Sequence, residues 1–248
     1  MDINYLFNSG FLIRDEKILI AIDDCEDPAG IVDAAYDTGD FDRLYIFASH
    51  AHFDHFSTHI RAYAPKVTQY ILSYDIKRTK RVKIFPSAKI TYMKRYSDWT
   101  DNFISVWTYD STDIGVSFLI RLPSGKRIFH AGDFNWWHWE DDTPENIALA
   151  EKAFNRQMKR LEGMFADVAF FPVDERLGNS QELGAIEFVS RTKVKSFVAM
   201  HRVGYPQWQP SEKFLSVARD IPTWAPIKPG EFRAFIDDKF IAEPVAVG

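Results

Sequence analysis

Three histidines and one aspartate lie close together in a short segment early in the chain. They are His50, His52, Asp54 and His55, in the pattern HxHxDH. Neutral imidazole and ionised carboxylate are ligands that Zn²⁺ and related divalent ions accept, at about 2.0–2.2 Å, so several of them must converge on one point. A loop can turn such side chains inward together. The pattern therefore predicts a metal site, with a polar, solvated loop as the alternative explanation.

The elements around this segment place it at the end of a strand. Residues 44–48 form an apolar run that is typical of a buried strand, so the histidines would lie on the loop at its carboxyl end. Asp133 follows a strand expected at 127–130, and His201 follows one expected at 196–200. We expect both to be metal ligands; the alternatives are a turn residue for Asp133 and a core histidine for His201.

Composition and charge narrow the class of protein. The chain has 248 residues, of which 46% are apolar, and a formal net charge of −5. This is typical of a globular protein with a sizeable core, and we predict a single domain over 1–248. The acidic balance argues against a nucleic-acid partner bound through overall charge. Oligomeric state is not indicated by the sequence.

The single cysteine, Cys25, excludes an intramolecular disulfide and favours a site built from nitrogen and oxygen ligands. A reducing cytoplasm is the expected setting. The first residues lack a basic region followed by an apolar segment, and no apolar run approaches the ~18 residues that span a bilayer. We therefore expect neither export nor membrane anchoring.

The remaining pattern predicts sheets covered by helices. Residues 75–83 carry a run of basic side chains, which indicates a solvated helix face or a docking patch for an anionic substrate or partner. Strands are expected in a hairpin over 4–23 and at 67–74, 90–92, 104–109, 115–120, 127–130, 168–171, 196–200 and 231–236. Helices are expected at 28–35, 57–64, 143–163, 180–191 and 211–219.

The order of these candidates resembles the metallo-β-lactamase superfamily, whose members carry HxHxDH, a later Asp after Gly and a final His, each at a strand end. The resemblance covers nearly the whole chain and looks closest to the small stand-alone hydrolases that include the ascorbate-6-phosphate lactonases. It implies an α+β four-layer αββα sandwich, with two mixed β-sheets face to face, helices outside, and a metal centre at one edge.

The resemblance also implies roles for the residues. His50 and His52 would bind a first metal, Asp54, His55 and His201 a second, and Asp133 would bridge them. The resemblance implies one or two divalent ions. Zn²⁺ is the expected ion, and Mn²⁺ or Fe²⁺ are the alternatives. The implied enzyme is a metal-dependent hydrolase with Asp54 as a catalytic residue, in which a metal-bound hydroxide attacks a small ester, lactone or phosphoester.

One position departs from the superfamily. Its members supply a third histidine to the first metal just before the strand that here begins at Gly115, and this chain has none there. Asp110 or Asp113 would replace it, or His138 would complete the site; otherwise the first site is weak or degenerate. An added oxygen ligand would shift the preference toward harder ions such as Mn²⁺.

Candidate substrate contacts follow the predicted ligands. Trp136 and His138 come just after Asp133 and would wall a pocket, with packing under the next helix as the alternative. Arg202 would bind an anionic substrate group or be solvated. His130 and Asp174 are candidates for orienting a ligand.

Two other functions stay open at this point. A nuclease of the same superfamily is disfavoured by the acidic balance and by the absence of an added nucleic-acid-binding domain. A non-catalytic metal-binding or ligand-binding protein is motivated by the missing histidine. The substrate itself is not indicated, because specificity lies in loops that one sequence does not interpret.

Overall fold

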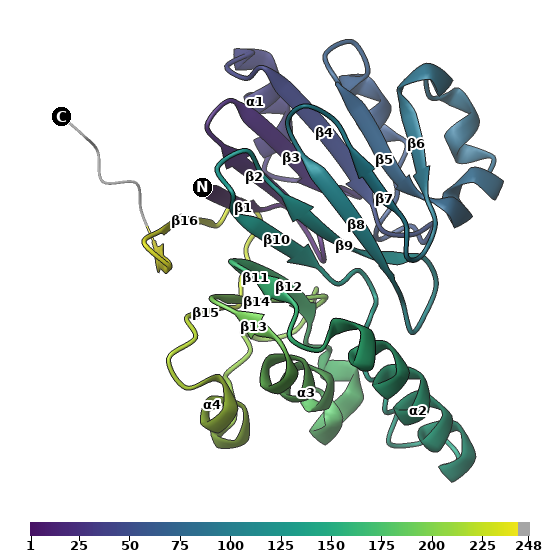
Figure 1. Ribbon diagram of the computed structural model, residues 1–248, viewed down its shortest axis with the longest axis vertical. Helices are drawn as coiled ribbons and strands as arrows, with labels where there is room; N and C mark the ends of the chain where they lie inside the picture. The colour runs from purple at the N-terminus through teal and green to yellow at the C-terminus, as the bar shows by residue number, and fades with distance from the viewer. Residues whose placement is uncertain (243–248) are drawn as a thin grey trace. The chain divides into compact units, whose positions relative to one another are not determined.

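The computed structural model describes residues 1–242, and the chain divides into two compact units, each built on one large mixed sheet (Figure 1). Unit 1 comprises 1–94 and the residues from 226 onward, and unit 2 comprises 95–225. The prediction of a single domain stays a prediction. Among the described residues, no helix combines the length and apolar character needed to cross a membrane.

Unit 1 contains an eight-stranded sheet in the order β17-β16-β1-β2-β3-β4-β5-β6. Its strands are β1 (Asp2–Tyr5), β2 (Phe11–Asp15), β3 (Ile18–Ile22), β4 (Arg43–Ala48), β5 (Gln69–Ser73), β6 (Ile90–Met93), β16 (Phe232–Ile236) and β17 (Lys239–Ile241). Its helices are α1 (Ile31–Thr38) and the short 3₁₀ helices η1 (His59–Tyr63), η2 (Tyr74–Arg78), η3 (Arg81–Ile84) and η4 (Ser87–Lys89).

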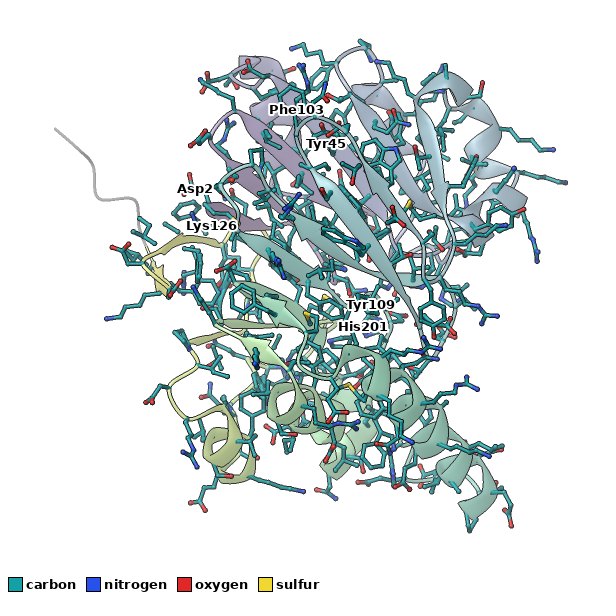
Figure 2. All side chains as sticks on the ribbon, viewed as in Figure 1. Asp2, Tyr45, Phe103, Tyr109, Lys126 and His201 are labelled. Carbon is teal, nitrogen blue, oxygen red and sulfur yellow. The ribbon has the colours of Figure 1, made fainter. Side chains whose placement is uncertain are left out.

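Successive side chains of a strand point to opposite faces of the sheet, and in unit 1 the helices cover one of these faces. Leu44 and Ile46 of β4 belong to a buried cluster with Val32 of α1, Ile60 of η1 and Val82 of η3. The intervening β4 side chains point to the opposite face, as the pleat requires, and are also fully buried, Tyr45 among them (Figure 2). A strand buried on both faces gives the continuous apolar run seen in the sequence.

The last four strands in this sheet order fix the position of the loop after β4 that carries His50, His52, Asp54 and His55, called the histidine loop below. β3, β4, β5 and β6 run parallel to one another, so their carboxyl ends meet at one edge. The loops after β3, β4 and β5 therefore lie beside one another, although they are far apart in the sequence.

Unit 2 contains a seven-stranded sheet in the order β15-β14-β12-β10-β9-β8-β7 and the small pair β11-β13. Its strands are β7 (Asp98–Thr100), β8 (Ser105–Asp110), β9 (Val116–Arg121), β10 (Arg127–His130), β11 (Phe165–Ala166), β12 (Val168–Pro172), β13 (Lys193–Val194), β14 (Phe197–Met200) and β15 (Thr223–Trp224). Its helices are α2 (Pro144–Leu161), η5 (Glu175–Ser180), α3 (Leu183–Arg191) and α4 (Glu212–Ala218).

In unit 2, too, the carboxyl ends of parallel strands lie at one edge of the sheet. β10, β12 and β14 run parallel to one another, so the residues that follow them meet at one edge. Two helices of this unit begin where the sequence predicts: Thr143 caps α2 by accepting from the Asn146 N–H, and Ser211 caps α4 by accepting from the Phe214 N–H. The helix expected from 180 begins at Leu183 instead.

Two other sequence predictions were wrong in detail. The hairpin expected over 4–23 is three strands, because residues 6–10 close a tight turn in which Gly10 N–H donates to the Phe7 carbonyl and Asn8 adopts a left-handed φ of 51°. The basic segment is not one helix but the separate 3₁₀ helices η2 and η3. The two-residue strands β11, β13 and β15 were not predicted, because periodicity has no meaning over so short a length.

The loop after β10 is packed directly against α3, and Gly184 permits this. A Cβ at Gly184 would lie 2.0 Å from Asn135 Oδ1 and 2.9 Å from the Trp136 backbone nitrogen. That oxygen is not free to move away, since it accepts the Trp136 N–H at 2.8 Å in a buried position. The loop that carries Asp133 therefore rests on a helix surface without a side chain.

We predict that Gly184→Ala destabilises the protein by about 1–3 kcal/mol, because the added methyl group displaces this loop. Urea unfolding followed by circular dichroism measures the change. Ser190→Ala, an exposed substitution on the same helix, is the control and should stay within about 0.5 kcal/mol of wild type. Equal stability of the two variants would contradict the packing described.

Candidate metal centre

In unit 1, a buried carboxylate holds the start and the end of the histidine loop. Asp23 follows β3 and is fully buried. Its Oδ1 accepts the Ser49 N–H at 2.7 Å, and its Oδ2 accepts both the Ser49 hydroxyl and His55 Nδ1–H at 2.7 Å. Three donors on one carboxylate offset its desolvation and fix the ring of His55.

His50 is oriented through the same network. The single hydroxyl proton of Ser49 goes to Asp23, so His50 Nδ1–H donates to Ser49 Oγ at 3.0 Å. Nε2 of His50 then lies 3.0 Å from Nδ1 of His52. Two nitrogens bound to one tetrahedral ion would lie about 3.3 Å apart, so this pair has the spacing of metal ligands.

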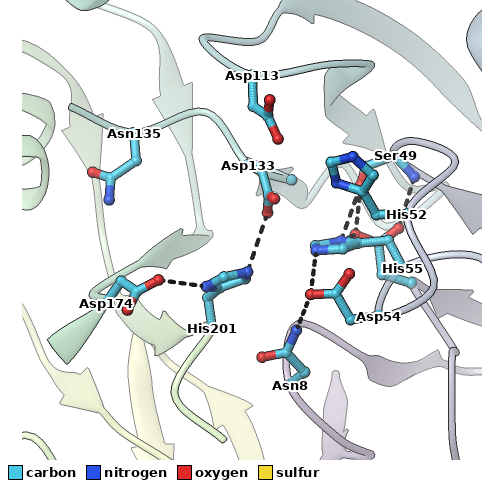
Figure 3. Close-up of polar contacts among 12 residues, drawn as sticks. Asn8, Ser49, His52, Asp54, His55, Asp113, Asp133, Asn135, Asp174 and His201 are labelled. Carbon is cyan, nitrogen blue, oxygen red and sulfur yellow. Dashed lines mark hydrogen bonds and ion pairs between the residues drawn. The ribbon is translucent and has the colours of Figure 1, made fainter. Parts of the chain in front are cut away.

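Asp54 completes the unit 1 cluster from the solvent side (Figure 3). Its Oδ2 accepts Asn8 Nδ2–H at 3.1 Å and lies 3.6 Å from His55 Nε2. About half of its side chain is exposed. Unit 1 therefore brings His50, His52, Asp54 and His55 together, as the sequence predicted for this segment.

In unit 2, a second buried carboxylate orients His201 (Figure 3). His201 follows β14 with a left-handed φ of 65°, and its Nδ1 lies 3.0 Å from Oδ2 of Asp174, which follows β12. Its Nε2 lies 3.7 Å from Oδ1 of Asp133, which follows β10. Unit 2 therefore brings the two late ligand candidates together, and strain at His201 is typical of a functional position.

The loop before β9 brings a third carboxylate to this cluster. Carboxylate oxygens of Asp113 and Asp133 lie within 4.8 Å of each other. Two hydrogen bonds fasten the loops that carry them: Thr112 Oγ1–H donates to the Asn135 carbonyl at 2.6 Å, and Asn135 N–H donates to Thr112 Oγ1 at 3.0 Å. Asp110 instead pairs with Arg95 at 3.1 Å, away from this cluster.

Two further side chains shape the Asp133 loop. His130 is fully buried, and its Nδ1 accepts the Gly132 N–H at 3.2 Å, so it is a structural histidine that supports the turn. Trp137 Nε1–H donates to the Asp133 carbonyl at 3.0 Å, and its ring meets that of His201 edge-on with centroids 5.9 Å apart. Trp137, rather than its neighbours, contacts the ligand candidates.

The predicted substrate contacts lie as follows. The Trp136 ring stacks on Phe154 of α2 with centroids 5.6 Å apart, which is the packing alternative. The His138 ring lies edge-on to Trp136 at 6.4 Å. Arg202 is buried and donates to the Val173 and Pro206 carbonyls and to Glu175, so its guanidinium is already engaged. Substrate binding by these three residues stays a prediction, and the geometry of Arg202 does not favour it.

The donor sets fit a divalent cation. In each unit a buried carboxylate takes Nδ1 of one histidine, while the Nε2 atom faces a further carboxylate, Asp54 in unit 1 and Asp133 in unit 2. This is the arrangement of metal-binding histidines, whose second ring nitrogen is held by an acceptor. The clusters therefore suit one or more divalent ions; nitrogen and oxygen donors alone do not name the metal.

The sequence did not indicate the contacts of Asp23, Asn8 and Trp137, or that Arg176 donates to Asp174. Asp23 had no signal beyond its place at a strand end. What gives it a role is that β3 lies beside β4 in the sheet, and strand order is not written in the sequence.

Arg176 completes the unit 2 network by donating both Nε–H and Nη2–H to Asp174 while lying over the Trp139 ring. Burial alone would raise the pKa of Asp174, but the hydrogen bonds from His201 and Arg176 outweigh it and lower the pKa to about 2. Because this pKa lies below the unfolded value near 3.9, the carboxylate stabilises the fold above about pH 4, and this contribution is lost as the pH falls toward 2.

We predict that Asp174→Asn lowers the stability of metal-free protein at pH 7 by about 2 kcal/mol and flattens the loss of stability between about pH 5 and 2. Urea titrations at several pH values in the presence of a chelator measure both effects. Asp42→Asn, at an exposed aspartate, should reproduce the wild-type pH profile. A wild-type profile in Asp174→Asn would argue against a folded-state pKa near 2.

Comparison with known proteins places the fold. No family model matches the sequence, and no curated protein matches it. Among solved structures, the chain is similar to Igni18, described as a novel metallo hydrolase from the hyperthermophilic archaeon Ignicoccus hospitalis KIN4/I, with 16% identity, a TM-score of 0.66, and coverage of 93% of this chain and 96% of that one.

Two further solved structures agree. YhfI from Bacillus subtilis, described as a metallo-β-lactamase fold protein, has 10% identity and a TM-score of 0.57 over 93% of this chain and 98% of that one. An isothiocyanate hydrolase from Delia radicum gut bacteria has 13% identity and a TM-score of 0.55 over 95% of this chain and 99% of that one. The predicted fold class is confirmed: the chain has two mixed sheets with helices, in the metallo-β-lactamase fold.

Proposed function

We propose that this protein is a metal-dependent hydrolase that acts on a small ester, lactone or phosphoester. The observation that carries the proposal is the pair of buried carboxylates, Asp23 and Asp174, that hold His55 and His201 by Nδ1 at 2.7 and 3.0 Å. Placing an ionised carboxylate behind an imidazole costs desolvation, and metal-binding histidines are a common reason for it. The metallo hydrolase and the isothiocyanate hydrolase of similar fold support the proposal by analogy.

The proposed metal ligands are those that the resemblance to the metallo-β-lactamase superfamily implies. They are His50, His52, Asp54, His55, Asp133 and His201. The unit 1 cluster has three histidines and one carboxylate, and the unit 2 cluster has Asp133 and His201. A catalytic ion needs about three protein ligands and an open position.

We assign the third position of the first site to Asp113. Its carboxylate lies within 4.8 Å of that of Asp133, whereas Asp110 is committed to Arg95. Exchanging an imidazole for a carboxylate adds a hard oxygen donor and one negative charge. The proposed centre would accept Mn²⁺ or Fe²⁺ beside Zn²⁺.

A divalent ion in such a site lowers the pKa of bound water to about 7 and polarises the group under attack. Asp54 is suited to accept a proton there, because about half of its side chain is exposed and its Oδ2 lies 3.6 Å from His55 Nε2. The Trp137 ring lies edge-on to the ring of His201, with centroids 5.9 Å apart. A small-molecule substrate is proposed, since the acidic chain is poorly suited to a polyanion.

We predict that His52→Ala and Asp133→Ala each lower both the metal content of the purified protein and its metal-dependent turnover by at least about tenfold. His52 follows β4 and Asp133 follows β10, so an equal effect of both substitutions tests whether both residues are ligands. Metal analysis by mass spectrometry and a panel of lactone, ester and phosphodiester substrates with Zn²⁺ and Mn²⁺ are the measurements.

His59→Gln is the matched control, because His59 pairs with Asp24 at 3.0 Å outside the proposed ligand set. It should retain metal and turnover. Metal content unchanged in both ligand variants would contradict the proposal. Metal retained without turnover on any substrate would instead favour a non-catalytic metal-binding protein.

We also predict that Asp113→Ala weakens the binding of one ion by about tenfold, whereas Asp110→Ala leaves it within twofold of wild type. The reason is that only Asp113 lies beside Asp133. Titration of metal-free protein with Mn²⁺, followed by calorimetry, separates the two variants. A larger effect in Asp110→Ala would show that the assignment of the third ligand is wrong.

A further inference from the structure

One guanidinium in the basic segment turns toward the histidine loop. Arg81, the first residue of η3, donates from Nη2 to the Ala51 carbonyl and from Nη1 to the Phe56 carbonyl. It also lies over the rings of Phe53 and Phe56, 4.4 and 5.2 Å from their centroids. A single side chain therefore contacts the loop at its beginning, middle and end.

A carboxylate from the same segment holds the opposite side of the same peptide. Asp75, in η2, accepts the Ala51 N–H on Oδ2 at 2.8 Å. Ala51 is thus held by its amide through Asp75 and by its carbonyl through Arg81. It is the residue between His50 and His52, so the two contacts fix the backbone on both sides of it.

The sheet explains why this segment reaches the loop. β5 is the parallel neighbour of β4, with Ala48 opposite Leu72, so the residues after both strands emerge at the same edge. Asp75 lies two residues beyond β5, and Arg81 follows after η2. The other cations of the segment, Lys77, Arg78, Lys80 and Lys83, are exposed, which is the solvated alternative for a basic run.

We propose that Asp75 and Arg81 form a clamp that sets the spacing of His50 and His52 and thereby the affinity of the site for its metal. They are positioning residues: they act through the backbone of the loop. The proposal rests on the proposed function, because it concerns the same ligands. The tilt of each imidazole follows from the φ and ψ of the loop. Backbone hydrogen bonds close its later part, where His55 N–H and Phe56 N–H donate to the His52 carbonyl, and the Ala51 peptide before it is held by Asp75 and Arg81.

Rigidity matters here because metal ligands must be held close to the productive geometry. The loop also carries Phe53, whose side chain is 82% exposed and lacks the burial that would otherwise anchor the middle of the loop. Arg81 lies 4.4 Å from the centroid of that ring, and its fork-shaped guanidinium donates to two carbonyls at once, which an ammonium group does not reproduce.

The test measures the dissociation constant for Zn²⁺ by competition with a chromogenic chelator, together with the melting temperature, in full-length protein. Asp75→Ala and Arg81→Ala should each weaken Zn²⁺ binding by about tenfold, which is the loss of affinity typical when a residue that holds a metal ligand in place is removed. Asp75→Asn keeps an acceptor oxygen for the Ala51 N–H and should bind Zn²⁺ within about threefold of wild type. Lys83→Ala, an exposed cation on the same 3₁₀ helix, is the matched control and should bind Zn²⁺ as wild type does.

Hydrogen exchange of the peptide spanning residues 50–56 gives a readout independent of metal. Exchange should accelerate in Asp75→Ala and in Arg81→Lys, which loses one of the two carbonyl contacts, and stay at the wild-type rate in Lys83→Ala. Zn²⁺ affinities within twofold of wild type in both alanine variants would overturn the clamp. Failure of wild-type protein to bind Zn²⁺ or Mn²⁺ would overturn the proposed function instead, so the two failures are distinguishable.

Discussion

The hydrogen bond between a buried carboxylate and the Nδ1 of a histidine is the interaction on which the candidate site depends. Asp23 makes it with His55 and Asp174 makes it with His201. Each carboxylate is almost fully excluded from water, and each is stabilised by several donors rather than by one. Because a buried charge without partners is costly, each network keeps its histidine in one orientation.

Parallel strands make these networks feasible. In both units the chemistry lies on loops that leave the carboxyl ends of neighbouring parallel strands, so residues far apart in the chain meet without long connections. Each loop has backbone hydrogen bonds of its own, such as Phe56 N–H to the His52 carbonyl and Phe134 N–H to the Ala131 carbonyl. The loops are also fastened from outside, by Asp75 and Arg81 in unit 1 and by Thr112 and Trp137 in unit 2.

The fold and the site carry different kinds of information. Identities of 10–16% with solved structures leave the fold recognisable, because a fold requires only apolar patterning and suitable turns. In the proposed site, Asp113 in place of a histidine would change the donor set and the charge without any change in the strands around it. Metal preference and substrate therefore depend on a few side chains in loops.

The sequence by itself determined the four early ligand candidates, because HxHxDH places them on one loop. It also determined most long elements, because α2 begins with a capping residue and β12 and β14 are continuous apolar runs. It also marked Asp133 and His201 by their places at strand ends. It did not determine that Asp23 supports Ser49, that Asp113 rather than Asp110 accompanies Asp133, or that Arg81 turns inward from a basic run. Those contacts were decided by strand order and by loop-to-loop hydrogen bonds, which join residues 20 to 30 positions apart or more and leave no local pattern in the chain.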